Sequence, residues 1–137
     1  MPMDFSTSMT VAASGMRAQS ERMKIIAENI ANANSTSQVP GGDPYRRKIA
    51  TVRSTFDQEL GANLVESGKP VPDMTNFRTQ YDPGNPNADK QGYVKLPNVD
   101  SLIEVMDMRE AQRSYEADIT VMDATKSMQS RTVDLLK

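Results

Sequence analysis

Histidine and cysteine are both absent from this sequence of 137 residues. Histidine is the commonest general base and the commonest protein ligand of transition metals. Its absence excludes Ser-His-Asp and Cys-His catalytic arrangements and ordinary zinc sites. Without cysteine the chain forms no disulfide and offers no thiolate. We therefore predict that the chain is not an enzyme and has no catalytic residue, no cofactor and no metal ligand.

Large apolar side chains are also scarce. Aromatic residues make up 5% of the sequence, tryptophan is absent, and apolar residues reach only 37%. An average globular chain is about 45–50% apolar, on a definition that also counts glycine. Ten methionines shift the apolar set further towards flexible side chains that suit adaptable interfaces. We expect such a chain to complete its core with partners.

The sequence has no strong charge of either sign and no long apolar run. Its net charge of −2 and pI near 5.1 give no basic footprint for nucleic acid. We expect the only basic cluster, Arg46-Arg47-Lys48, to be solvated or paired with neighbouring side chains. No run of 18 apolar residues exists, so we predict no membrane span. The first residues, Met1-Pro2-Met3-Asp4, do not resemble a cleaved secretory signal.

Residues 6–34 contain no proline and one glycine, Gly15, which favours a long helix. Apolar or small residues recur in steps of three and four, with one polar position at Gln19. We predict that this helix ends in the Asn-rich stretch from Asn29 to Thr36, because asparagine tolerates the left-handed conformation of a C-cap. The stripe consists of Phe5, Met9, Ala12, Met16, Met23, Ile26, Ile30 and Ala33.

Residues 98–137 contain neither proline nor glycine and predict a second, longer helix. Asn98 is a candidate N-cap, and Ser101 with Glu104 offers an alternative capping box. A second stripe has a mean step near 3.5 residues, which is typical of a coiled coil or a helical array. It consists of Leu102, Val105, Met108, Ala111, Tyr115, Ile119, Met122, Thr125, Met128, Thr132 and Leu135.

The segment between these helices, residues 37–97, holds all but one of the seven glycines and all but one of the eight prolines. Residues 45–56 are the best strand candidate, because they are rich in β-branched and aromatic residues. Residues 77–81 alternate cleanly, the Asp-Pro-Gly-Asn-Pro run at 82–86 predicts a loop, and residues 92–96 are a possible return strand. We therefore predict a small β module with ordered loops.

Two groups of oxygen ligands deserve comparison with cation sites. Asn85, Asn87 and Asp89 alternate as calcium ligands do, but Lys90 and Leu96 stand where an EF-hand loop needs Gly and Glu. We predict a turn-rich loop in which Asn and Asp bond their own backbone. Acidic residues also recur at positions 104, 107 and 110, and there we expect them to complement the dipole of the second helix.

Together these patterns predict a mainly α protein with a small β module. The long N- and C-terminal helices would pack as a coiled-coil-like pair, with a short β-rich insert between them. The expected division is 1–36 for the first helix, 37–97 for the module and 98–137 for the second helix. Both helices also carry apolar residues off the stripes, which calls for more than one neighbour each. These are Val11 and Ile25 on the first, and Ile103, Met106, Val121 and Val133 on the second.

Five sequence runs carry a resemblance to a known family. They are Ser14-Gly15-Met16 with A-E-N-I-A-N-A-N-S-T at 27–36, Y-D-P-G-N-P-N-A-D at 81–89, G-Y-V-K-L-P-N-V at 92–99, and A-Q-R-S-Y-E-A-D at 111–118. The chain resembles the bacterial flagellar rod and hook proteins, and within them the basal-body proteins of the proximal rod. Asp118 and the variant stretch at 35–39 depart from the usual pattern, since relatives usually carry Asn in place of Asp118.

The resemblance implies a structural subunit that is exported by the flagellar type III apparatus without a cleaved signal. It would polymerise with other rod proteins and with copies of itself in the periplasmic rod of the basal body. Its neighbours would include components near the membrane ring and export gate and components of the distal rod, and the assembly would transmit torque. The alternatives are another axial or secretion-needle-like subunit, or a free coiled-coil adaptor. The expected assembly interface is Met9, Met16, Met23, Ile26, Ile30, Leu102, Val105, Met108, Tyr115, Ile119, Met122, Met128 and Leu135.

Overall fold

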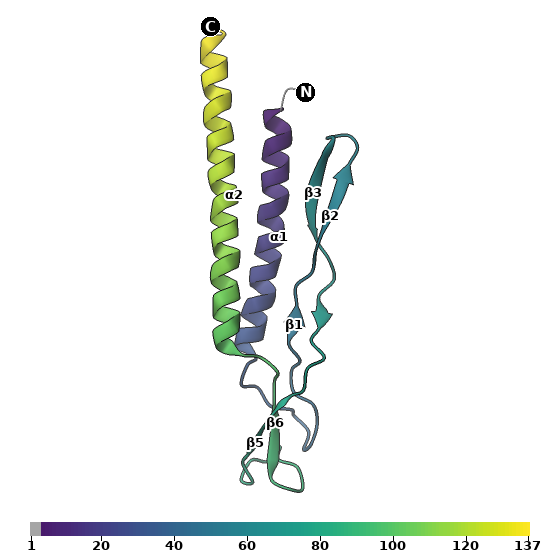
Figure 1. The fold of residues 1–137 in the computed structure, drawn as a ribbon. Coiled ribbons are helices and arrows are strands. Elements are labelled where there is room, and N and C mark those ends of the chain that lie inside the picture. The colour runs from purple at the N-terminus through teal and green to yellow at the C-terminus, as the bar shows by residue number, and fades with distance from the viewer. Residues whose placement is uncertain (1–3) are drawn as a thin grey trace. The chain divides into compact units, whose positions relative to one another are not determined.

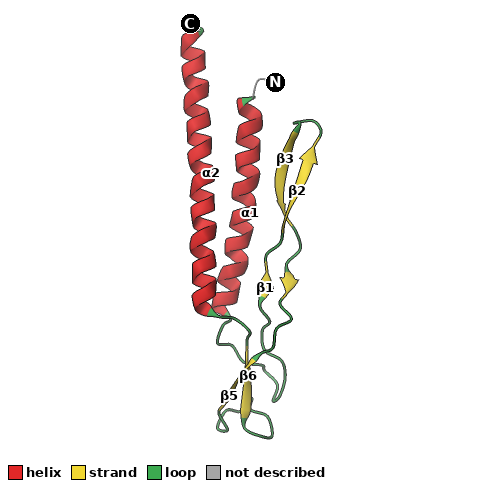
Figure 2. Ribbon diagram, viewed as in Figure 1, coloured by secondary structure: helices red, strands yellow, loops and turns green. Residues whose placement is uncertain are grey.

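The computed structural model describes residues 4–137, in which two long helices precede and follow, along the sequence, three short antiparallel strand pairs (Figures 1 and 2). The prediction for Met1-Pro2-Met3 concerns residues outside this range. The predicted fold class, a helical pair with a β-rich insert, is confirmed. The elements are α1 (Phe5–Ala31), β1 (Lys48–Ile49), β2 (Val52–Asp57), β3 (Ala62–Ser67), β4 (Val71–Pro72), β5 (Arg78–Tyr81), β6 (Tyr93–Leu96) and α2 (Ser101–Leu135).

The contacts divide the chain into two compact units, each of which takes a part of both helices. The first unit combines residues 4–23, 51–69 and 109–137, and the second combines residues 24–50 and 70–108. Each unit is described by itself below. The three-part division of the sequence at residues 36 and 97 stays a prediction.

Both helices begin at an aspartate. Asp4 Oδ1 accepts a hydrogen bond from the amide of Ser6 at 3.1 Å, and Asp100 Oδ1 accepts one from the amide of Leu102 at 3.0 Å. Such side chains satisfy amides that have no partner within the first turn. The two predicted caps of α2, Asn98 and Ser101, are therefore wrong. Asp100 directly precedes the first helical residue, and Asn98 is bonded to other segments.

The end of α1 was predicted close to its true position but for the wrong reason. The helix ends at Ala31, and every described residue with a positive φ angle is a glycine, so no asparagine there adopts the left-handed conformation. Instead, the Asn32 side chain donates to the carbonyl of Glu28 at 2.8 Å. Arg78 Nη2 donates to the carbonyl of Ala33 at 2.9 Å, which places a cation at the negative end of the helix.

In the first unit, α1 and α2 run antiparallel with small residues buried between the packed elements. A Cβ atom added to Gly15 would lie 2.7 Å from Asp118 Oδ2, so glycine permits this close approach. Arg22 pairs with Glu110 at 3.6 Å. The buried residues of this unit are Ala12, Ser14, Ala18, Ala111 and Thr125. Small side chains therefore bring the backbones together. Met9, Met16, Met23 and Met122 of this unit are half-buried, whereas Met128 is exposed.

The hairpin of β2 and β3 lies beside α1 in the same unit. Its register runs from Val52 opposite Ser67 to Asp57 opposite Ala62. The buried hydroxyl of Ser14 accepts a hydrogen bond from the amide of Val65 at 3.1 Å, which fastens the hairpin to the helix. The strand predicted at 45–56 is confirmed only in part, as β1 and β2, and the sequence analysis missed β3 and β4.

In the second unit, β5 and β6 pair from Arg78 opposite Leu96 to Tyr81 opposite Tyr93, and both strands were predicted. The loop between them folds on its own polar side chains, as predicted. Asn85 Oδ1 accepts from the amide of Asn87 and Asp89 Oδ1 from that of Gln91, both at 2.9 Å. The core of this unit includes Val94, Val99 and Ile26.

Gly92→Ala should destabilise the β5–β6 hairpin by about 1–3 kcal/mol, because Gly92 has a φ of +89° that alanine adopts only with strain. An added Cβ would also lie 3.2 Å from that of Pro83. Amide exchange at Tyr93–Leu96 measures the effect, and it should become faster. Gly84→Ala is the matched control, since its nearest neighbour would be 4.0 Å away and its φ is not positive. Equal exchange rates in the two variants would contradict this account.

Candidate functional site

The most deeply buried charged side chain is that of Glu104 in the first turns of α2, where its exposed fraction is 0%. Its Oε1 accepts a hydrogen bond from Arg47 Nε, and its Oε2 accepts one from Asn29 Nδ2 at 3.4 Å. A carboxylate without water is stable only when it is paired and hydrogen-bonded. Glu104 therefore holds three segments of the second unit together: the end of α1, the segment before β1, and α2.

Arg47 is the centre of a cluster of three carboxylates. Besides Glu104, its guanidinium contacts Asp73 at 3.2 Å and Asp107 at 3.7 Å. Burial alone would lower the pKa of Arg47, but the hydrogen bonds and charges of Glu104 and Asp73 outweigh it and raise that pKa above its ordinary value. The guanidinium is therefore a permanent cation, and its planar group suits several carboxylates at once.

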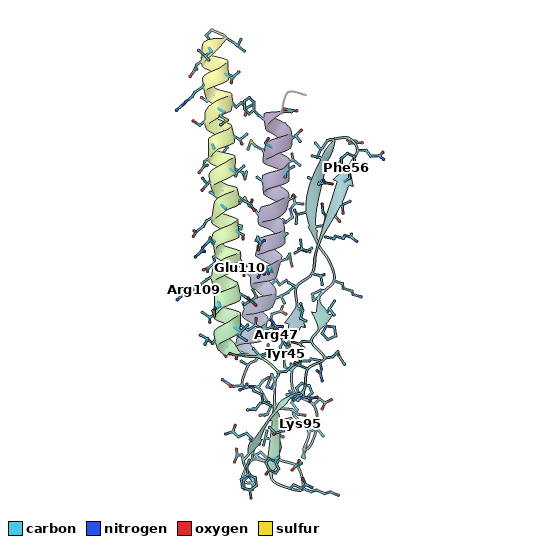
Figure 3. The ribbon with its side chains drawn as sticks, viewed as in Figure 1. Tyr45, Arg47, Phe56, Lys95, Arg109 and Glu110 are labelled. Carbon is cyan, nitrogen blue, oxygen red and sulfur yellow. The ribbon has the colours of Figure 1, made fainter. Side chains whose placement is uncertain are left out.

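Asn29 connects the helix to the β module through its side-chain amide. Its Nδ2 donates to the carbonyl of Lys48 at 2.9 Å, and its Oδ1 accepts from the amide of Lys48 at 3.0 Å. The hydroxyl of Tyr45 donates to the same Oδ1 at 2.7 Å. Burial, followed by the charges of Glu28 and Glu104, raises the pKa of Tyr45, so its proton stays in this bond. Figure 3 shows Tyr45 close to Arg47.

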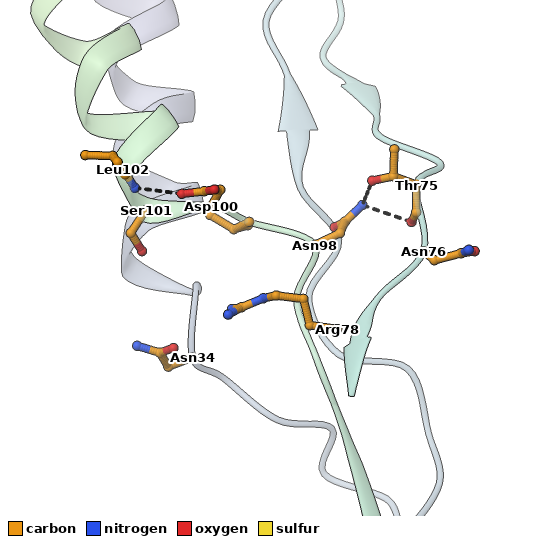
Figure 4. A pocket seen from close by; sticks show the side chains of 9 residues that line it. Asn34, Thr75, Asn76, Arg78, Asn98, Asp100, Ser101 and Leu102 are labelled. Carbon is orange, nitrogen blue, oxygen red and sulfur yellow. Dashed lines mark hydrogen bonds between the residues drawn. The ribbon is translucent and has the colours of Figure 1, made fainter. Parts of the chain in front are cut away.

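Asn98 also bonds the backbone through its side-chain amide, at Arg47 itself. Its Oδ1 accepts from the amide of Arg47 at 2.8 Å, and its Nδ2 donates to the carbonyl of Asp73 at 2.9 Å and to Thr75 (Figure 4). The amide of Asp73 donates in turn to the carbonyl of Arg47 at 2.9 Å. The backbone on either side of residue 47 is thus fixed by two asparagine side chains.

Asp73 completes the cluster. Its carboxylate accepts from the amide of Thr75, and this bond, with smaller contributions from the Thr75 hydroxyl and from Arg47, outweighs burial and lowers the pKa of Asp73 below 3.8. Its ionised form is therefore favoured in the folded state. Asp73 therefore stabilises the fold at pH values above its pKa in the unfolded chain. This contribution is lost as the pH falls through the lower pKa that Asp73 has in the folded state.

The side chains of this cluster bond one another and the backbone, and they hold the segments of the second unit together. Its carboxylates are occupied by Arg47, Asn29 and Thr75. Within residues 4–137 no group of three or more His, Cys, Asp or Glu side chains has the geometry to hold a metal ion. None of the described helices is long and apolar enough to cross a membrane.

The structure extends the interpretation of Glu104 and refines that of the basic cluster. Glu104 lies in the first turn of α2, where an acidic side chain complements the helix dipole, but it is also a buried ion-pair partner, because Arg47 reaches it from the β module. Pairing of the basic cluster with neighbours is confirmed for Arg47, and for Lys48, which pairs with Glu28 at 3.2 Å. Asn29 and Asn98 were misread as cap residues. The repeated asparagines of the motif at 27–36 could have indicated a hydrogen-bonding role, but only the tertiary contacts show which groups they bond.

The predicted assembly residues fall into two groups by exposure. On α1 all five are buried or half-buried, and on α2 Met108, Tyr115 and Met122 are half-buried. The other five members on α2 are exposed: Leu102, Val105, Ile119, Met128 and Leu135. The α2 residues buried inside the chain are Glu104, Ala111 and Thr125, so much of the predicted stripe does not form the internal seam.

Comparison with known proteins gives consistent results. The family described as "Flagella basal body rod protein" matches residues 9–37, and the one described as "Flagellar basal body rod FlgEFG protein C-terminal" matches residues 90–135. The chain is 49% identical to the flagellar basal-body rod protein FlgC of Agrobacterium fabrum, covering 96% of this chain and 95% of that protein. It is 38% identical to FlgC of Bacillus subtilis, with coverage of 95% and 97%. For FlgC of Aquifex aeolicus the identity is 36%, with coverage of 98% and 99%.

Arg47→Met should lower the free energy of unfolding by about 3–5 kcal/mol, because it leaves the buried carboxylate of Glu104 without its cation. Urea unfolding of the full chain measures the change. The matched control is Arg53→Met, which removes an exposed pair with Glu66 and should cost no more than about 1 kcal/mol. Adding Glu104→Leu to Arg47→Met should recover part of the loss. Equal effects of the two arginine substitutions would show that the cluster is not the main constraint.

Proposed function

We propose that this chain, because it belongs to the FlgC family of flagellar basal-body rod proteins, polymerises through the outer faces of its two long helices. It is a structural subunit of the rod. Its neighbours in the assembly are copies of itself and other rod proteins. The outer faces of the helices carry the contacts between subunits. The cluster around Arg47 fixes the second unit internally, and the small buried residues fix the first.

The observation that carries this proposal is the number of large apolar side chains that α2 leaves exposed. In the second unit these are Leu102, Ile103, Val105 and Met106, and in the first unit they are Ile119, Val121, Met128, Val133 and Leu135. Apolar side chains that gather on the surface of a soluble protein mark interaction sites, and an assembly would cover them. Burying one such side chain fully contributes about 1.5–3 kcal/mol. The exposed members of the predicted assembly set, such as Leu102 and Ile119, are therefore assigned to contacts between subunits.

The wider setting follows from the family. We infer that the chain lies in the proximal, periplasmic part of the rod, between components near the membrane ring and export gate and those of the distal rod. It is exported by the flagellar type III apparatus and helps to transmit torque. A rod subunit needs rigid, repeated contacts and no chemical step. That need is consistent with a sequence that has neither histidine nor cysteine.

Ile119→Asp should block rod assembly and motility while the protein is still synthesised. Ile119 lies on the predicted stripe and is 37% exposed, so it is available to a partner. A charge buried without a partner at a contact costs several kcal/mol, and every subunit would carry the defect. Swimming assays and counts of intact basal bodies measure the effect.

Two control variants introduce the same side chain at exposed positions off the stripe. Thr120→Asp changes the next residue of α2, and Lys24→Asp changes α1. Both should be milder than Ile119→Asp. If cells with Ile119→Asp swim normally and build intact rods, α2 is not packed as proposed.

A further inference from the structure

A groove in the first unit lies between the start of α1, the turn of the β2–β3 hairpin and the middle of α2. Its volume is about 830 Å³. Apolar and small side chains form its walls, among them Val11, Ala12, Leu60, Val65 and Val121. Three carboxylates, those of Asp4, Glu59 and Asp118, also line it, and no lysine or arginine does. The groove thus has apolar walls and acidic side chains along them.

Asp118 is the most unusual of these carboxylates. It is half-buried against Gly15, and burial raises its pKa above 3.8. No side-chain hydrogen bond or salt bridge within residues 4–137 compensates it. Asp118 therefore lacks the cation that Arg47 provides for Glu104. A basic side chain from outside the chain would be attracted to this position.

The first unit also contains a segment with exposed apolar and basic side chains, which complement the apolar walls and the carboxylates of the groove. The pairs Gly15–Asp118 and Arg22–Glu110 set the antiparallel register, which brings the start of α1 opposite about residue 128 of α2. All residues from 126 to 137 are exposed, including Leu135 at 87% and Leu136 at 83%. Met128 and Leu135 lie on one face of the helix, because they are two turns apart. Lys126, Arg131 and Lys137 make this overhang basic, against one acidic residue, Asp134.

We propose that the groove binds the overhang, residues 126–137, of a second copy of this chain. This inference rests on the proposed function and names the contact that it requires. Met128 and Leu135 would enter between the apolar walls, and Arg131 or Lys137 would reach the carboxylates. An amphipathic helix in an apolar groove is a common mode of recognition. Because groove and overhang are different surfaces of one chain, the contact is head-to-tail and generates an open helical polymer unless its rotation closes a ring.

Engineered cysteines test the contact directly, since the chain has none of its own. Cells would express two differently tagged copies of the full chain, one with Leu135→Cys and one with Ala62→Cys, which lines the groove. Isolated basal bodies would then be treated with a mild oxidant. The proposal predicts a disulfide-linked dimer that carries both tags.

Asn63→Cys is the matched control for Ala62→Cys. Asn63 is the next residue of β3, is exposed, and does not line the groove. We expect at least about tenfold more dimer with Ala62→Cys than with Asn63→Cys, as for a specific contact worth more than 1.4 kcal/mol. Equal yields overturn the proposal. A product that links Ala62→Cys to a different rod protein also overturns it, because the occupant would then not be a second copy.

A charge exchange tests the same contact without cysteines. Glu59→Lys and Arg131→Glu should each reduce the number of assembled rods about tenfold, and the double variant should restore most of the loss. A double variant no better than the worse single variant overturns the pairing. The presence of the chain in rods distinguishes a failure of the groove proposal from a failure of the proposed function. If the chain is present in purified rods but these contacts fail, only the groove proposal is lost; if the chain is absent from rods, the proposed function is lost.

Discussion

The pairing of Glu104 with Arg47 is the constraint on which the arrangement of the second unit depends. A carboxylate with no exposed surface requires its cation at a fixed place, and that cation lies on the segment that leads into β1. Asn29 and Asn98 bond the backbone on either side of Arg47, so the guanidinium has little freedom to move. The cluster therefore sets where α2 begins relative to the end of α1 within this unit. A purely apolar contact is not directional and would leave that register less well defined.

In the first unit, the packing of the elements depends on small side chains and not on a buried ion pair. Glycine and alanine at its buried positions let the backbones approach closely, as Gly15 does against Asp118. Such a seam buries little apolar area, because its members have small side chains. The larger residues of α2 in this unit, such as Ile119 and Met128, remain exposed. The division suits an assembly subunit: the inner face determines geometry, and the outer face retains the side chains that gain most from burial by a partner.

Sequence periodicity predicted the elements well but not their contacts. Both helices, β5, β6 and the turn-rich loop followed from local rules: missing helix breakers, alternation, and the bonds of Asn and Asp to nearby backbone. The strand β3 was not predicted because the exposed β2–β3 hairpin has no clear alternation of apolar residues, and β4 was not predicted because it has only two residues, one of them proline. The Arg47 cluster escaped because its members come from residues 29, 47, 73, 98 and 104, and no spacing rule connects them. The stripe on α2 includes two residues of the internal seam, Ala111 and Thr125, but it omits Glu104, because an apolar pattern excludes a charged residue.

The division of the α2 stripe into buried and exposed residues has a physical meaning. Periodicity marks residues that are buried somewhere, and it does not distinguish burial by the same chain from burial by a neighbour. On α1 the stripe is covered within the chain, whereas on α2 it turns towards solvent at Leu102, Ile119 and Leu135. A single isolated chain gains nothing from the exposed members, because apolar surface in water lowers solubility without adding stability. Ala111 and Thr125, by contrast, are stripe members that the chain itself buries. The fold of one chain thus explains part of the apolar period of α2, and the proposed assembly offers burial to the rest.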